Sequence, residues 1–83
     1  EVNNNSHIKI YPNPAENILN IDSESKSIDS LSLFDINGRQ ISQHMYSTYT
    51  SNILLNFPNI DSGIYILRIT SGDQVYHKKL FKK

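Results

Sequence analysis

The 83-residue chain contains no cysteine, no tryptophan, and only three glycines and three prolines. The absence of cysteine excludes disulfide frameworks, thiolate metal sites and thiol nucleophiles. The scarcity of glycine argues against a glycine-rich loop that cradles phosphate groups. No apolar run approaches the roughly 20 residues that a membrane-spanning helix needs. These absences remove several classes of enzyme and membrane protein before any motif is considered.

Charge is balanced, with eight Lys and Arg residues against eight Asp and Glu residues. A neutral chain has no overall field that steers it toward nucleic acid, so we expect no nucleic-acid partner. A chain of this length folds as one domain and buries roughly 60% of its unfolded surface, which leaves little room for a deep pocket. We therefore expect one small domain, present as a monomer.

The N-terminal residues differ in composition from the rest of the chain. Residues 1–7 are polar and rich in asparagine, whereas short apolar runs begin at Ile8. The chain does not begin with Met, and its start has neither the basic residues nor the apolar stretch of a signal peptide. We expect residues 1–7 to be a linker from an upstream part of a longer protein and residues 8–83 to be its C-terminal domain.

From Ile8 onward, apolar and polar residues alternate with a period of two, and no stretch keeps a helical period for three turns. Turn residues divide this region into short segments spaced about 8–12 residues apart. The pattern predicts an all-β fold, an immunoglobulin-like antiparallel β-sandwich of about seven strands with Greek-key connections. The expected strands are 8–11, 17–22, 29–35, 39–45, 52–57, 63–70 and 75–82.

Residues 35–39, with the letters DINGR, predict a tight hairpin turn. A two-residue loop at Asn37-Gly38 would split the flanking apolar residues between the two faces, whereas a three-residue loop keeps them together and is favoured. In that loop Asp35 starts a type I turn and Gly38 occupies a left-handed bulge position. The longer loop pairs Leu33 with Ile41. It places on one face Leu31, Leu33, Ile41 and Met45.

Residues 61–65, with the letters DSGIY, stand before another alternating strand. An aspartate, a glycine and a tyrosine in this order are typical of the tyrosine corner of immunoglobulin-like sandwiches, where the hydroxyl bonds to upstream backbone. Tyr65 and the next alternate residues should therefore face the core. The full set of expected core residues is Leu19, Ile21, Leu31, Leu33, Ile41, Leu55, Tyr65, Leu67 and Ile69.

Residues capable of catalysis or metal binding form no recognisable constellation. The three histidines, in separate segments without ligand spacing, are His7, His44 and His77. Asp22, Glu24 and Asp29 surround a serine-rich loop, and turn solvation explains them better than a cation site. No G-x-S-x-G motif is present. Tyr46 and Tyr49 leave open a minor possibility of ligand stacking. We assign no catalytic, cofactor-binding or metal-binding residue and expect no enzyme.

Residues 78–83 place four lysines around two apolar residues. One interpretation is an edge strand that lysine protects against aggregation. The other is a recognition handle, read by strand addition or by an acidic receptor. The residues alone leave both interpretations open.

Four segments, taken in order, resemble a known family. Residues 11–15 (YPNPA), followed by Leu19-Asn20-Ile21, resemble the opening of the type A C-terminal sorting domain of the type IX secretion system. Residues 31–39 resemble its central hairpin, residues 63–69 its G-x-Y strand, and residues 78–80 its basic terminal strand. The resemblance covers residues 8–83.

This resemblance implies a sorting signal that directs a cargo protein from the periplasm through the type IX outer-membrane translocon, to the cell surface or the medium. The implied partners are an N-terminal cargo domain, translocon and shuttle proteins, and a sortase-like peptidase. The peptidase removes the domain and in some cases attaches the cargo to surface lipopolysaccharide. The candidates for translocon recognition are Lys78, Lys79, Leu80, Phe81, Lys82 and Lys83. The motif residues with structural roles are Pro12, Asn13, Pro14, Asp35, Gly38, Gly63 and Tyr65.

An alternative from another class is an immunoglobulin-like adhesive or carbohydrate-binding module that stays attached to a secreted protein. A small hydrolase is a third and weaker interpretation. The first two differ in whether the module remains on the mature protein.

Overall fold

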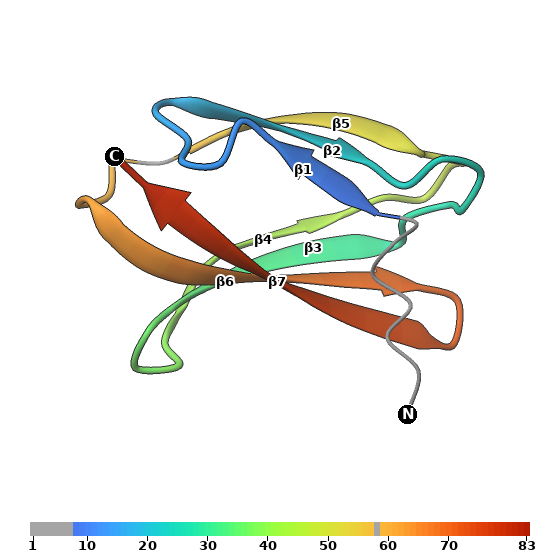
Figure 1. Cartoon of the computed structure of the whole chain (residues 1–83). Coiled ribbons are helices and arrows are strands. Elements are labelled where there is room, and N and C mark those ends of the chain that lie inside the picture. Colours follow the sequence, from blue (N-terminus) through green and yellow to red (C-terminus); the bar gives the residue numbers. More distant parts are fainter. Residues whose placement is uncertain (1–7, 58) are drawn as a thin grey trace.

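The computed structural model describes residues 8–57 and 59–83, which form two facing β-sheets (Figure 1). The three-stranded sheet has the order β1-β2-β5 and the four-stranded sheet the order β4-β3-β6-β7, with antiparallel pairing throughout. The strands are β1 (Lys9–Tyr11), β2 (Ile18–Asp22), β3 (Ser30–Asp35), β4 (Gln40–Met45), β5 (Asn52–Asn56), β6 (Gly63–Ser71) and β7 (Gln74–Lys82). These orders are those of an immunoglobulin-like β-sandwich, as the sequence predicts. The expected linker, residues 1–7 with His7, lies outside the described residues.

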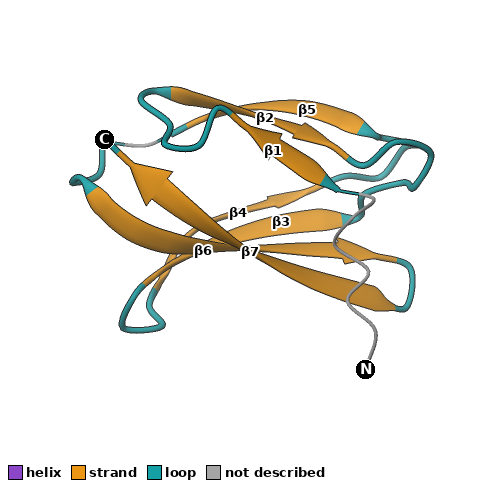
Figure 2. Cartoon of the chain, viewed as in Figure 1, coloured by secondary structure: helices purple, strands orange, loops and turns teal. Residues whose placement is uncertain are grey.

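Loops gather at the two ends of the sandwich, and the described segments contain strands and loops without a helix (Figure 2). Within residues 8–57 and 59–83, therefore, no helix is long and apolar enough to cross a membrane. Each strand boundary lies within about one residue of the expected one, because the turn residues that interrupt the alternation also end the strands.

The core lies between the two sheets and is built mainly from alternate residues of β2, β3, β6 and β7, with Leu55 of β5. Eight of the nine expected core residues are buried, all except Ile41. The sequence pattern missed five further buried hydrophobic residues, most of them near strand ends or in connections: Ile8, Ala15, Ile28, Tyr76 and Leu80. Apolar side chains from both sheets thus form one continuous core.

The hairpin between β3 and β4 has the expected loop but not the expected register. The N–H of Gly38 donates to the carbonyl of Asp35 at 3.0 Å, and Phe34 pairs with Gln40, as a three-residue loop requires. A β-bulge between Leu33 and Phe34 then shifts the pairing by one residue. Leu33 faces Ser42, so the expected Leu33–Ile41 pair is wrong.

The bulge also changes which residues of β4 face the core. One extra residue in a strand moves every later side chain to the opposite face. Met45 is consequently 72% exposed, and its expected place on the inner face is wrong. Ile41, the extra residue, is half-buried against the core instead of fully buried.

Candidate functional site

The alternation of β7 divides the basic C-terminal segment between two faces. Leu80 is fully buried, and Lys78 and Lys82 are half-buried on the same side of the strand. Burial lowers the pKa of Lys78. Lys79 and Phe81 are exposed on the opposite face. The six candidate recognition residues therefore do not form one continuous handle, because the strand presents only alternate side chains to any partner on one face.

The connection between β1 and β2 pairs with the free edge of β7. The N–H of Phe81 donates to Oδ1 of Asn13 at 2.9 Å, and Nδ2 of Asn13 donates to the carbonyl of Lys79 at 3.2 Å. The N–H of Ala15 donates to the carbonyl of Phe81, and the N–H of Lys83 donates to the carbonyl of Ala15, both at 2.8 Å. We call Asn13 and Ala15 the edge clamp.

The edge clamp gives the residues between β1 and β2 a structural role. A sheet edge presents unpaired N–H and C=O groups that invite association with other chains. Asn13 lies between Pro12 and Pro14, which have no N–H to offer the edge, so its side-chain amide supplies the contacts. Ala15 then forms a parallel bridge with Lys82. The motif thus covers the last part of β7, a role that the sequence pattern did not reveal.

The hairpin turn is held by Asp35. Its Oδ1 accepts hydrogen bonds from the N–H groups of Asn37 and Arg39, each at 2.9 Å, and its Oδ2 lies 3.2 Å from Nε of Arg39. The hydrogen bond from the N–H of Arg39 lowers the pKa of Asp35, with further lowering from the N–H of Asn37 and the charge of Arg39. Gly38 has a φ of 88°, so the predicted bulged turn is confirmed.

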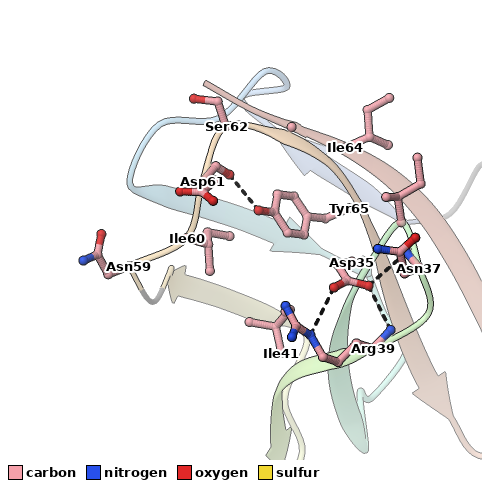
Figure 3. A pocket seen from close by; sticks show the side chains of 12 residues that line it. Asp35, Asn37, Arg39, Ile41, Asn59, Ile60, Asp61, Ser62, Ile64 and Tyr65 are labelled. Carbon is pink, nitrogen blue, oxygen red and sulfur yellow. Dashed lines mark hydrogen bonds and ion pairs between the residues drawn. The ribbon is translucent and has the colours of Figure 1, made fainter.

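The tyrosine corner is confirmed as well. The hydroxyl of Tyr65 donates to the carbonyl of Asp61 at 2.7 Å, and the ring is buried. The corner and the hairpin turn form two walls of an open cavity of about 380 Å³ (Figure 3). Two of its polar side chains have structural partners: Asp35 bonds to the turn and to Arg39, and Tyr65 bonds to the backbone. Both side chains therefore stabilise the fold at this cavity.

Two of the acidic residues singled out from the sequence accept hydrogen bonds from backbone N–H groups, Asp22 within its own turn and Asp29 from the distant β6–β7 turn. Oδ1 of Asp22 accepts from the N–H of Glu24 at 2.8 Å, and Oδ2 of Asp29 accepts from the N–H of Gly72 at 2.7 Å. The described residues contain no group of three His, Cys, Asp or Glu side chains that could hold a metal ion. Tyr49 is exposed and donates to the carbonyl of Ser25 at 2.9 Å, while Tyr46 packs against the core.

The family-motif residues converge at one end of the sandwich, although they are far apart in sequence. The β1–β2 connection, the β3–β4 turn, the start of β6 and the end of β7 all lie there (Figure 1). A second open cavity of about 380 Å³ at this end is lined by Pro12, Pro14 and Lys83, among others. This convergence could not be read from any single motif.

The fold and these surfaces define a small all-β sandwich whose motif residues maintain its turns and one sheet edge. The family described as the secretion system C-terminal sorting domain matches residues 9–83, and the chain belongs to this family. The ulvan lyase NLR42 of Nonlabens ulvanivorans is 32% identical over 75 residues, which cover 88% of this chain. The same stretch covers 14% of the lyase, so the chain spans a small part of that relative's length.

The resemblance to the type IX sorting domains is therefore confirmed. The domain is a C-terminal sorting signal of that secretion system, and it belongs to a secreted or cell-surface cargo protein. The family consists of signals and not of catalytic domains. The remaining functional question is which protein binds this signal and which surface of the sandwich it contacts.

Proposed function

We propose that residues 8–83 carry an N-terminal cargo domain from the periplasm through the type IX outer-membrane translocon to the cell surface or the medium. The observation that supports this most is the family match along residues 9–83, together with the convergence of its motif residues at one end of the fold. An autonomous sandwich keeps its own surface whatever cargo precedes it, so the same receptor can read it on unrelated proteins.

In this proposal the domain is a substrate of the export chemistry and not an enzyme. Its partners are the translocon and shuttle proteins, which read it, and a sortase-like peptidase, which removes it. Residues 1–7 act as the linker that gives the peptidase access, since small polar residues at a junction are preferred sites of cleavage. The cargo is then released or attached to surface lipopolysaccharide.

The proposal gives the motif residues two kinds of role. Asn13, Asp35, Gly38 and Tyr65 maintain the edge clamp, the turn and the corner, as their hydrogen bonds and backbone conformation suggest. The basic segment 78–83 is the candidate for direct contact with the translocon.

The test is a fusion of residues 1–83 behind an unrelated periplasmic protein that carries its own signal peptide. In a host with a type IX system, the cargo should reach the surface or the medium without the domain. The same fusion in a strain that lacks the translocon should stay in the periplasm. The N-terminal sequence of the released domain fragment identifies the cleavage position.

A fusion that folds and yet remains in the periplasm of the competent host would contradict export. A fusion that reaches the surface with the domain still attached would contradict removal, and would favour a retained immunoglobulin-like binding module.

A further inference from the structure

The outer face of the four-stranded sheet departs from the pattern expected of a solvated face. A sheet that packs on one side normally carries polar residues on the other. Because Leu33, Leu67 and Leu80 are buried, the intervening residues of β3, β6 and β7 face outward. Five of these outward residues are apolar. Val75 lies beside the β6–β7 turn, and the other four are larger: Phe34, Ile64, Ile66 and Phe81.

These four residues form one patch across three neighbouring strands. Phe34 on β3 pairs with Ile66 on β6, and Ile64 on β6 pairs with Phe81 on β7. Directly paired residues share a face, and residues two apart on one strand do as well. Ile64 is 38% exposed and Phe81 is 42% exposed, so the patch is open to a partner.

Basic residues border this patch. Lys79 pairs directly with Ile66, and the guanidinium of Arg68 lies 4.8 Å from the centre of the Phe34 ring. The cation–π contact holds the Arg68 charge in place beside the apolar residues. We call the six residues together the apolar–basic patch: Phe34, Ile64, Ile66, Arg68, Lys79 and Phe81.

The chain has no net charge, but its charged residues are unevenly distributed. Five of the eight basic residues fall within residues 68–83, against one acidic residue there, Asp73 in the β6–β7 turn. Among the described outward-facing residues of β3, β4, β6 and β7, none is Asp or Glu. The face is therefore cationic, whereas the acidic residues that the structure describes lie in loops and at strand ends.

We propose that the apolar–basic patch is the surface by which the type IX machinery recognises this domain, an inference that rests on the proposed function. The occupant is a protein surface with an apolar centre and carboxylates at its margin. Apolar residues exclude water at the centre of an interface, and opposite charges at its margin steer the encounter. Within the basic segment, Lys79 and Phe81 make this contact.

An anionic lipid surface shares part of this chemistry but fits less well. Stable attachment to anionic lipid uses clusters of roughly four to eight basic residues, each contributing modestly. The patch has two, Arg68 and Lys79, and the guanidinium of Arg68 lies over an aromatic ring. A preorganised planar guanidinium beside exposed apolar residues suits a carboxylate on a protein better.

The test compares export of the fusion carrying I64S/F81S or K79E with export of the parent fusion. Both variants should fold, because these side chains are exposed. I64S/F81S should lower the exported fraction about tenfold, the size of effect that central interface residues commonly have. K79E should also lower it, because a reversed charge at the margin disfavours the encounter. Controls on the other sheet are L54S, at a residue that is 58% exposed on β5, and K9E on β1, and both should be exported normally.

A photocrosslinking side chain at position 81, and another at position 54 as control, identifies the contact in cells. Crosslinking from position 81 to a translocon or shuttle protein, through an acidic segment, supports the proposal. Normal export of both folded patch variants overturns it. Binding of the purified domain to phosphatidylglycerol vesicles that is lost in the variants, without a protein crosslink, assigns the patch to lipid and overturns the protein partner. Failure of the parent fusion itself contradicts the proposed function, so the two outcomes are distinct.

Discussion

Asn13 and Phe81 lie 68 positions apart in the sequence, and a 2.9 Å hydrogen bond joins Oδ1 of Asn13 to the N–H of Phe81. One short polar side chain therefore connects the first connection of the sandwich to its last strand. With Ala15, it occupies the backbone groups of Phe81 that point away from β6. The edge of β7 is covered here by two residues of the chain itself.

Replacing Asn13 by Ala should lower the free energy of unfolding by about 1 kcal/mol, since two hydrogen bonds are lost at a partly solvated site. Asp at this position keeps the acceptor and should have a smaller effect. The direct measurement is amide hydrogen exchange, in which the N–H of Phe81 should exchange faster in Asn13→Ala. Asn17→Ala, in the same connection, serves as the control. Equal exchange of the Phe81 N–H in the parent, in Asn13→Ala and in Asn17→Ala would mean that the clamp does not protect the edge.

Replacing Gly38 by Val should destabilise the domain by more than about 1 kcal/mol. No atom lies within 4 Å of an added Cβ, so the loss comes from the positive φ and not from a clash. Asn tolerates this backbone region, and Gly38→Asn should therefore retain more stability. Urea unfolding of the two variants measures the difference. If Val and Asn are equivalent, the left-handed turn is not what stabilises the hairpin.

Removing the hydroxyl of Tyr65 with Phe should cost about 0.5–1.5 kcal/mol, because the carbonyl of Asp61 loses its donor while the ring stays buried. Tyr49→Phe removes a comparable hydrogen bond from a side chain that is 67% exposed. That control should change stability by less than about 0.5 kcal/mol. The midpoints of urea unfolding of Tyr65→Phe and Tyr49→Phe measure the difference. Equal stability of the two variants would mean that the hydrogen bond of the tyrosine corner does not stabilise the fold.

Asp35 should contribute to the acid sensitivity of the fold. Its pKa in the folded state lies below the ordinary value of 3.8, so its stabilising effect is present above that pH and is lost as pH falls through the folded pKa. Asp35→Asn should therefore show a flatter loss of stability below pH 3.8 than the parent. Thermal midpoints measured across this range test the expectation.

Arg39→Gln separates the two causes of the lowered pKa of Asp35. The backbone N–H of Arg39, which makes the largest contribution, survives this substitution. The variant should therefore keep most of the parent's acid dependence. If the thermal midpoints of the parent and of Asp35→Asn fall identically as the pH is lowered, the Asp35 carboxylate does not cause the loss of stability in acid.

The strands were predictable because their signals are local. Alternation gives the faces of a strand, and turn residues such as Asp35 and Gly38 give its ends, so the seven strands and most of the core follow from the sequence. The tyrosine corner is equally local, since Tyr65 bonds to backbone four residues earlier.

The features that could not be predicted depend on contacts between distant segments or on one extra residue. The bulge at Leu33–Phe34 moves Met45 outward, and the alternation of β4 alone gives no sign of it. The edge clamp joins Asn13 to a strand that no local rule connects with it. The apolar–basic patch was hidden for another reason: runs such as Ile64-Tyr65-Ile66-Leu67 are apolar on both faces, and only the paired sheet distinguishes the inner face from the outer one.

The parallel bridge between Ala15 and Lys82 has a consequence for how the domain is made. A ribosome synthesises residue 15 long before residue 82, so the edge clamp can form only after β7 has left the exit tunnel. A chain that stops before Phe81 lacks the N–H that Asn13 binds and the carbonyl that Ala15 binds. A chain whose synthesis stops before Phe81 therefore cannot form the edge clamp, so the clamp is among the last contacts of this fold that become possible during synthesis.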